Sequence, residues 1–214
     1  MEVLDVLINC EYSGIVREEF KKLGHNAWSC DLLPSEIGGG NHIQGDAIEA
    51  AYGRHWDLMI GHPPCTYMCN SGVEWLDKKD GRWPQLMDAA DFFLKLWSAP
   101  IEKICLENPI MHKYAYALIK MKQTQVIQPY MFGHTETKAT CLWLKNLPKL
   151  TPTNNVKMQM MQLSKKERER LHYLPPSPDR GKIRSKTYEG IAKAMAQQWG
   201  MDEGKKFQPV NIFD

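Results

Sequence analysis

The sequence contains no hydrophobic run that approaches the roughly 20 residues needed to cross a bilayer. It has no positively charged leader either: the first five residues, MEVLD, carry two acidic side chains, which argues against a secretory signal. Neither sign of charge dominates, because 27 basic and 25 acidic residues leave a net charge of +2, which points to no particular partner. We therefore expect a cytoplasmic protein with no membrane partner.

Disulfide and metal frameworks are also missing. Of the six cysteines, only Cys65 and Cys69 lie close together in the sequence, as expected for free thiols in a reducing compartment. These two and His62 could be metal ligands, but a zinc site usually needs a second close pair, so we expect no bound metal. The remaining cysteines are expected to be core thiols: Cys10, Cys30, Cys105 and Cys141.

Hydrophobic residues make up 43% of the 214 residues, enough for one globular domain with a sizeable core. Short apolar runs predict strands over residues 3–8, 27–30, 56–60, 104–106, 125–128 and 139–145. Helical periodicity appears over residues 15–23, 84–97, 112–121, 162–174 and 186–199. Strands that alternate with helices predict an α/β fold with a mostly parallel sheet. We expect a core over residues 1–150, followed by a connector and C-terminal helices over residues 151–214 that pack on it.

Polar or reactive side chains follow four of the predicted strands. In an open α/β sheet, ligands bind at the carboxyl ends of the strands, so these side chains are candidates for one shared site. An ordinary polar loop is the alternative. The candidates are Cys10 with Glu11, Asp31, Cys65, and Glu107 with Asn108.

The chemistry of these groups is complementary. A cysteine thiolate such as that of Cys65 is a strong nucleophile. A carboxyl group in a closed apolar site, such as that of Glu107, can hold a proton and donate a hydrogen bond. Asp31 and Asp46 could hold a nucleoside hydroxyl or amino group, although Asp46 could equally cap a helix. Together they indicate a nucleoside-containing cofactor beside an electrophilic ring.

Several stretches resemble the sequence blocks of the DNA cytosine-5 methyltransferases. "DLMIGHPPCTYMCNSG" is similar to the Pro-Cys block, "CLENP" to the Glu-Asn block and "HIQGDAI" to the Gly-Asp-Ile block. "MFGHTETKATCLWL" resembles the Gln-x-Arg-x-Arg stretch, in which only Lys138 keeps a basic side chain. "LSKKERERLHYLPP" resembles a later segment of the family, and "KTYEGIAKAMA" stands where its final cofactor-touching helix belongs.

The resemblance implies a class I S-adenosylmethionine-dependent methyltransferase (Rossmann-like) fold, with a seven-stranded, mostly parallel sheet flanked by helices. It implies that Cys65 adds to carbon 6 of cytosine and that Glu107 holds ring nitrogen 3 and the exocyclic amine. Lys138 would assist, and a cytosine flipped out of double-stranded DNA would be the substrate. The substrate-binding residues would be Pro64, Thr66 and Asn108. S-adenosyl-L-methionine would be held by Cys10, Glu11, Gly14, Asp31, Asp46 and Pro63.

This sequence departs from the family pattern in several places. The glycine-rich first block is reduced to "NCEYSG", a threonine follows Cys65, and Cys69 replaces a serine. Only 18 residues, 145–162, stand where the family inserts a large target-recognition domain. The chain therefore looks like a compact, phage-like member that would act in the host cytoplasm. Its specificity would be low, absent, or supplied by a protein partner or a homodimer.

Other interpretations remain open. The same chemistry on free deoxycytidine nucleotides fits the missing recognition domain, and a catalytically silent nucleic-acid-binding protein could share the fold. Residues 163–186 carry eight basic and three acidic side chains, which could contact phosphates or form a solvated helix face. Tyr67, Trp75 and Trp83 could stack on a base or simply pack.

Overall fold

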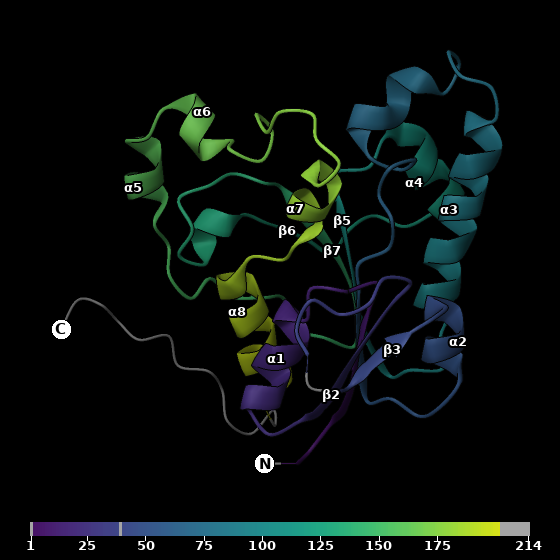
Figure 1. Cartoon of the computed structure of the whole chain (residues 1–214), viewed down its shortest axis with the longest axis vertical. Helices are drawn as coiled ribbons and strands as arrows, with labels where there is room; N and C mark the ends of the chain where they lie inside the picture. Colours follow the sequence, from purple (N-terminus) through teal and green to yellow (C-terminus); the bar gives the residue numbers. More distant parts are fainter. Residues whose placement is uncertain (1, 39, 202–214) are drawn as a thin grey trace.

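The computed structural model describes residues 2–38 and 40–201. Its seven strands form one sheet in the order β3-β2-β1-β4-β5-β7-β6 (Figure 1). The strands are β1 (Asp5–Asn9), β2 (Asn26–Asp31), β3 (His42–Gln44), β4 (Leu58–Gly61), β5 (Lys103–Pro109), β6 (Gln125–Ile127) and β7 (Thr140–Lys145). All six predicted strands are present, and β3 is an additional short strand at the edge.

The sheet is mixed, because one of its strands runs opposite to its neighbours. The strands from β3 to β5 are parallel, whereas β7 is antiparallel to both β5 and β6. Together with the helices on both faces, this order is the class I methyltransferase (Rossmann-like) architecture predicted from the sequence. The carboxyl ends of β2, β1, β4 and β5 therefore lie next to one another at one edge of the sheet.

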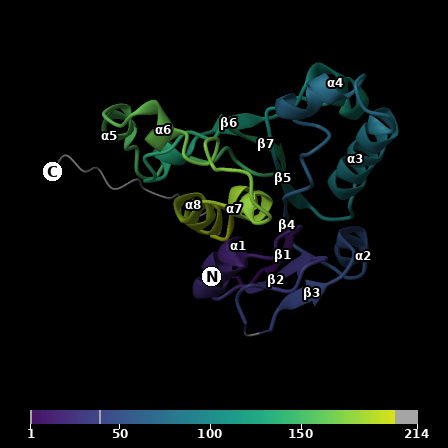
Figure 2. The same ribbon diagram turned by 45° about the horizontal axis from the view of Figure 1, so that its top comes forward.

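The helices are α1 (Ile15–Lys22), α2 (Ala47–Tyr52), α3 (Arg82–Trp97), α4 (Lys113–Ile119), α5 (Lys157–Met161), α6 (Lys165–Arg168), α7 (Arg180–Ser185) and α8 (Glu189–Trp199). Two 3₁₀ turns, η1 (Asn70–Trp75) and η2 (Pro129–Met131), interrupt the loops. α2, α3 and α4 lie on one side of the sheet and α1 with α8 on the other (Figures 1 and 2). Within the described part of the chain, no helix has the length and apolar character of a membrane span.

The two faces of the sheet bury alternate residues of the same strand. Leu7 packs in the core beneath α2, α3 and α4, whereas Val6 and Ile8 pack in the core beneath α1 and α8. Successive strand side chains point to opposite faces, so a strand covered on both sides must be apolar throughout. This explains the three consecutive apolar residues, Val6, Leu7 and Ile8, in the centre of β1.

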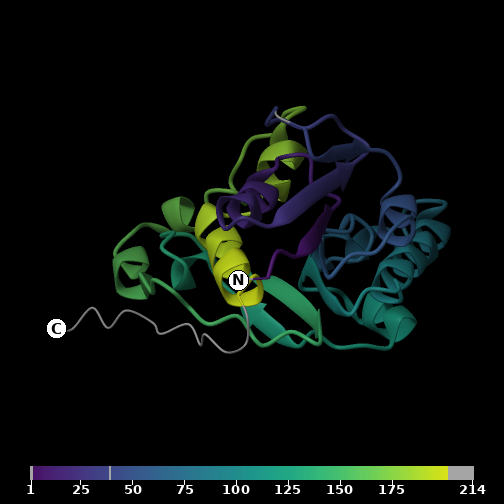
Figure 3. The same ribbon diagram turned by 90° about the horizontal axis from the view of Figure 1, so that it is seen from below.

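The C-terminal region differs from the prediction. Residues 162–174 do not form one helix; the only helix there is the single turn α6. Ser164 accepts the backbone N–H of Glu167, and Glu167 accepts that of Ser164, so a capping box starts the turn. Among residues 162–174 only Leu171 is buried, and a helix with no apolar face to pack gains too little to continue. α8 is present as predicted and packs against α1 (Figure 3); residues 202–214 lie outside the described residues.

One charged side chain is wholly buried beside the sheet edge. Arg17, on α1, has an exposed fraction of 0%. Its guanidinium donates to Glu18 at 2.9 Å, to the hydroxyls of Ser29 and Ser35 at 2.9 and 3.3 Å, and to the carbonyl of Ile37 at 3.2 Å. Arg17 thus ties α1 to β2 and to the loop that follows it.

Replacing Arg17 by Met should lower the free energy of unfolding by about 3 kcal/mol, because buried hydrogen-bonded groups lose their partner. Lys21→Met is the matched control: Lys21 also pairs with Glu18, at 3.3 Å, but both side chains are partly exposed, so its loss should cost at most about 0.5 kcal/mol. Urea denaturation measures both variants, and equal losses would show that Arg17 has no special structural role.

Candidate active site

The sheet brings the predicted residues of the strand ends to one rim. The backbone N–H of Glu11, just past β1, donates to the carbonyl of Cys30 on β2 at 3.0 Å. The backbone N–H of His62, just past β4, donates to the carbonyl of Asn9 on β1 at 2.9 Å. The rim therefore continues from β2 across β1 and β4, and Glu107 follows it on β5.

Asn108 fixes the Pro-Pro corner that carries Cys65. The Asn108 side chain is fully buried, and its amide donates to the carbonyl of Pro63 at 2.9 Å. Since Pro63 and Pro64 cannot donate backbone hydrogen bonds, this contact from β5 holds the corner in place. The side-chain oxygen of Asn108, Oδ1, is buried and has no hydrogen-bond partner among the described residues. The structure thus gives Asn108 a scaffolding contact that the sequence did not predict.

Glu107 is held by a histidine. Its Oε2 lies 3.2 Å from Nδ1 of His62, and the two side chains are only 18% and 9% exposed. Burial acts to raise the pKa of Glu107, but the hydrogen bond from His62 and the positive charges of Lys138 and His62 outweigh it, so this pKa lies below its usual value. Because an ionised carboxylate only accepts hydrogen bonds, Nδ1 of His62 carries the proton between them.

Cys65 lies beside a second thiol. Its carbonyl accepts the backbone N–H groups of Met68 and Cys69, both at 3.0 Å, which places Cys69 one helical turn further on. The hydrogen bond to Cys69 raises the pKa of Cys65, and burial and Glu107 add to this effect, while Lys138 opposes it.

Cys69 is the thiol that ionises more readily. Its sulfur lies 3.1 Å from the hydroxyl oxygen of Ser71. The hydrogen bond from Cys65 lowers the pKa of Cys69 to about 5, helped by the Ser71 hydroxyl and by the backbone N–H groups of Ser71 and Gly72, with burial acting in the opposite direction. These hydrogen bonds therefore favour ionisation of Cys69 over ionisation of Cys65.

Lys138 completes the rim from the loop before β7. Its Nζ donates to the carbonyl of Arg184 on α7 at 2.9 Å, and its charge reaches both Cys65 and Glu107. The hydroxyl of Tyr12 donates to the carbonyl of Lys182, also at 2.9 Å. α7 is therefore tied to the rim at two points. Beside it lies a hollow of about 380 Å³ lined by Gln128, Thr137, Lys138, Ala139, Glu169, Leu171, His172 and Arg184.

Glu11 is a buried acid at the start of α1. It is 5% exposed and accepts the N–H groups of Val16 and Arg17, at 2.8 and 3.3 Å, and the Ser13 hydroxyl at 3.2 Å. Burial nevertheless raises its pKa above the usual value, against the opposing effects of His62 and these hydrogen bonds. Gly14 precedes the helix with φ of 73°, and a Cβ there would lie 2.9 Å from the Arg17 guanidinium, so local structure alone already requires a glycine.

Two further acids lie around Cys10. Asp31, at the end of β2, accepts the N–H of Leu33 at 2.9 Å. Asp46 caps α2 by accepting the N–H groups of Ile48 and Glu49 at 2.6 and 3.2 Å, as the capping alternative predicted. Burial raises the pKa of Cys10, and the charges of Asp31, Cys30 and Asp46 raise it further. Asp31 and Asp46 thus lie close enough to Cys10 to act on its thiol.

The remaining cysteines divide into two groups. Cys30, Cys105 and Cys141 are fully buried, as predicted for core thiols. Cys10 differs, because it is only partly buried and has a φ of 58°, in the left-handed region that few non-glycine residues adopt. No group of three or more metal-ligating side chains is assembled in the described ranges, 2–38 and 40–201.

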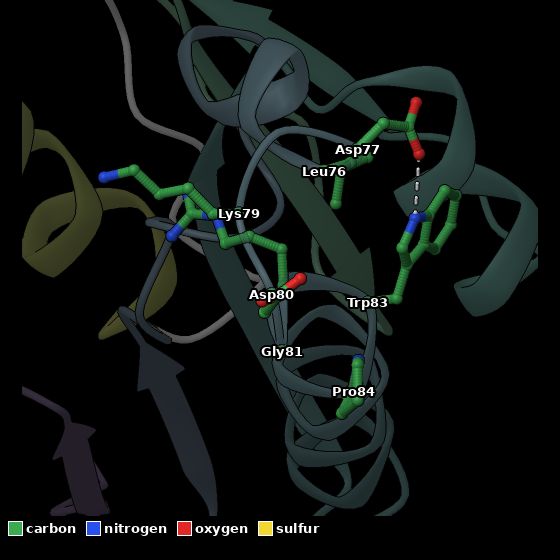
Figure 4. A pocket seen from close by; sticks show the side chains of 8 residues that line it. Leu76, Asp77, Lys79, Asp80, Gly81, Trp83 and Pro84 are labelled. Atoms are coloured by element: carbon green, nitrogen blue, oxygen red, sulfur yellow. Dashed lines mark hydrogen bonds between the residues drawn. The ribbon is translucent and has the colours of Figure 1, made fainter.

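The aromatic residues after Cys65 lie in the segment that leads into α3: Tyr67 precedes η1, Trp75 ends η1, and Trp83 is in the first turn of α3. Trp83 donates from Nε1 to Asp77 at 3.1 Å, beside a surface hollow of about 330 Å³ lined by residues 76–77 and 79–84 (Figure 4). The Trp83 ring also packs edge-on against Tyr114, with centroids 5.1 Å apart. The Arg82 guanidinium lies 4.6 Å from the centroid of the Tyr67 ring. Tyr67 and Trp83 therefore have packing partners, while Trp75 and Trp83 keep 38% and 39% exposure.

Two residues of this region are not predicted from the sequence in the places that the structure gives them. The sequence offers His62 only as a possible metal ligand and gives no indication that Arg17 is buried. His62 could have been found from its place immediately before the Pro-Pro-Cys corner, at the end of a predicted strand. Arg17 gave no such signal, because a charged residue on an amphipathic helix is ordinarily exposed.

No protein-family model and no curated protein matches the chain. Among solved structures, it is 14% identical, with a TM-score of 0.43, to a protein described as a DNA modification methyltransferase encoded within an E. coli prophage, over 66% of this chain and 46% of that one. It is 16% identical to the Entamoeba histolytica methyltransferase EhMeth (TM-score 0.42; 71% and 57% covered). It is also 16% identical to the Dnmt2 methyltransferase of S. pombe (TM-score 0.41; 83% and 61% covered). The chain thus spans about half of the length of the solved structures it matches.

The thiol pair makes a testable prediction. Replacing Cys69 by Ser removes the neighbour that raises the pKa of Cys65, so more Cys65 thiolate is present at pH 8. Iodoacetamide should then modify Cys65 faster, about tenfold for each unit by which the pKa falls. The rate is followed by mass spectrometry of the peptide containing Cys65. Cys30→Ser, which changes a buried thiol at another strand, is the control, and an unchanged rate in Cys69→Ser would contradict the assignment.

Proposed function

We propose that this protein methylates cytosine at carbon 5 in DNA, with S-adenosylmethionine as methyl donor and a covalent adduct on Cys65. One observation carries the proposal: Cys65 on its Pro-Pro corner and the carboxyl group of Glu107 stand at adjacent strand ends that are joined by the bond from Asn108 to Pro63. A nucleophile and a positioned acid or base on one rim are what addition to a polarised ring requires.

Each side chain has a distinct role in the proposed reaction. The Cys65 thiol gives its proton to the sulfur of Cys69, with which it shares a hydrogen bond, and the Cys65 sulfur attacks carbon 6 of the cytosine; the positive charge of Lys138 favours the thiolate form of Cys65. The carboxyl group of Glu107 holds ring nitrogen 3 and the exocyclic amine, so that the electrons displaced from the ring are stabilised. Carbon 5 is thereby activated. After methylation, the proton on carbon 5 passes to solvent, its electron pair re-forms the double bond between carbons 5 and 6, and the bond from carbon 6 to sulfur breaks so that Cys65 leaves as a thiolate. Pro64, Thr66 and the buried Asn108 shape the base pocket.

The cofactor would lie over the ends of β1 and β2. S-adenosylmethionine supplies the methyl group at carbon 5. A cationic nucleoside suits a rim lined by acids, and Asp31 and Asp46 stand together near Cys10 to hold its hydroxyl and amino groups. The family resemblance adds Cys10, Glu11, Gly14 and Pro63 to the residues that would hold it. This donor set fits the cofactor because carboxylates accept from ribose hydroxyls and attract a positive charge.

The free deoxycytidine nucleotide is a second candidate substrate. Between β7 and the basic segment, the described chain contains only a loop and the five-residue helix α5. A separate recognition domain for a DNA sequence does not fit in this connection. A small substrate would need none.

Labelling with tritiated S-adenosylmethionine separates the two substrates. We expect label in duplex DNA with the wild-type protein and none with Cys65→Ser. DNA that contains 5-fluorocytosine should trap a covalent adduct on Cys65, because fluorine at carbon 5 blocks the release step. Cys105→Ser, which alters a buried thiol on β5, should still be trapped. Label found in deoxycytidine nucleotides alone, or trapping on Cys69, would contradict the proposal as stated.

The DNA backbone would be contacted by part of the basic segment. Arg170 is paired with Glu136 at 3.0 Å and Lys186 with Glu36 at 2.6 Å, and Arg180 holds the carbonyls of Leu174 and His172. Among residues 2–38 and 40–201, no acidic side chain pairs with Lys182 or Arg184 on α7, and α7 is tied to the rim. We therefore assign phosphate contacts to these two residues.

Replacing Lys182 and Arg184 together by Ala should weaken duplex binding. Each lost phosphate contact should make the plot of log affinity against log salt shallower by about 0.9, and two contacts by about 1.8. The control is Lys21→Ala with Lys22→Ala, which removes the same charge from ion pairs at the far end of α1. Fluorescence titration across a range of salt concentrations measures both slopes. Equal slopes for the α7 variant and wild type would mean that these side chains form only a solvated face.

A further inference from the structure

His62 stands at the centre of the rim. β4 lies between β1 and β5 in the sheet, so the residue after β4 is flanked by the groups that follow β1 and those on β5. The backbone of His62 is held by the carbonyl of Asn9 at 2.9 Å. Its side chain is 9% exposed, and its Nδ1 lies 3.2 Å from the carboxyl group of Glu107.

The imidazole is flanked by two acids. On the β5 side is Glu107, and on the β1 side is Glu11; positive charge on His62 lowers the pKa of each. The Nε2 atom of His62 is buried and has no hydrogen-bond partner among the described residues. Lys138 is the other charged group that acts on Glu107, and the charge of Glu107 in turn raises the pKa of the thiols of Cys65, Cys105 and Cys141. Lys138 already donates from Nζ to the Arg184 carbonyl.

We propose that His62 is a positioning residue for Glu107 and the group that shares its proton with that carboxyl group during the reaction. The inference rests on the proposed function. When the Cys65 sulfur forms its bond to carbon 6, an electron pair moves onto ring nitrogen 3. That nitrogen takes a proton from the carboxyl group of Glu107, and the imidazolium of His62 passes its Nδ1 proton to the carboxylate. When the sulfur leaves, the proton returns from nitrogen 3 to Glu107 and then to His62, so no oxidant or further reactant is needed.

The arrangement suits this role because burial and charge oppose each other at Glu107. A buried carboxyl group beside a cation is held ionised, yet it can receive a proton from that cation without solvent access. The contact also fixes the direction in which the carboxyl group points, and a positioned acid contributes through geometry as well as through its proton.

Two substitutions separate positioning from proton sharing. His62→Asn keeps an N–H near the place of Nδ1 but cannot carry a positive charge, whereas His62→Phe keeps the ring volume and loses both. The first readout is the titration of the Glu107 carboxyl carbon by NMR in the free protein. Since His62 lowers the pKa of Glu107, the titration midpoint should rise in His62→Phe and rise less in His62→Asn.

The second readout is steady-state methyl transfer to duplex DNA. His62→Asn should lose on the order of 10²-fold in kcat with little change in KM, as expected when proton transfer is impaired. His62→Phe should lose as much in kcat and also show a higher KM, because the carboxyl group is no longer held. The control is His55→Asn, which removes a histidine beside an acid, Asp57, at an exposed position, where the His55 side chain is 77% exposed.

The NMR titration and the methyl-transfer measurement each have their own result that would overturn the inference. An unchanged Glu107 midpoint in His62→Phe overturns the inference, whatever the activity. Wild-type kcat in His62→Asn reduces His62 to a structural contact and overturns proton sharing. If the wild-type protein labels no cytosine at all, the proposed function fails, and the proton-sharing step fails with it; the NMR titration then still decides whether His62 controls the ionisation of Glu107.

Discussion

The candidate site depends on a buried hydrogen bond between neighbouring strand ends, from the Asn108 amide to the Pro63 carbonyl. This bond joins the loop after β4 to β5. The corner itself contains Pro63 and Pro64, whose backbone nitrogens carry no hydrogen to donate. A buried amide that lost this partner would leave polar groups unpaired at a cost of about 1–3 kcal/mol. The positions of Cys65 and Glu107 relative to one another are therefore set by the scaffold beneath them and not by the loop alone.

Charge at the rim is balanced by few cations. Four acids gather there: Glu11, Asp31, Asp46 and Glu107. His62 and Lys138 are the positive groups that act on Glu107. Arg17 instead donates its hydrogen bonds to β2 and to the loop that follows it. The acids thus fall into two sets. Glu107 is kept ionised by its cations, whereas burial raises the pKa of Glu11. Opposite perturbations at one rim are typical of sites where acids have different tasks.

The thiol pair shows how one difference from the family pattern, the cysteine at position 69, alters the chemistry of the site. Cys69 stands where the resembling family has a serine, and its sulfur takes the hydrogen bond of Cys65. A neighbour that ionises more readily keeps Cys65 protonated in the free protein. Lys138 acts against this effect, and its position is in turn held by α7. The reactivity of Cys65 is thus linked to the docking of a C-terminal helix that lies some 45 residues further along the chain than Lys138.

The sequence by itself determined six of the seven strands, the fold class and the placement of reactive groups at strand ends, because apolar runs and turn residues are local properties. It failed over residues 162–174, where helical periodicity existed without an apolar face to bury. The burial of Arg17, the contact between His62 and Glu107, and the choice of which thiol ionises were decided only by the tertiary structure. Each depends on groups that are far apart in the chain, and only the order β1-β4-β5 and the packing of α1 and α7 bring them within hydrogen-bonding or electrostatic reach.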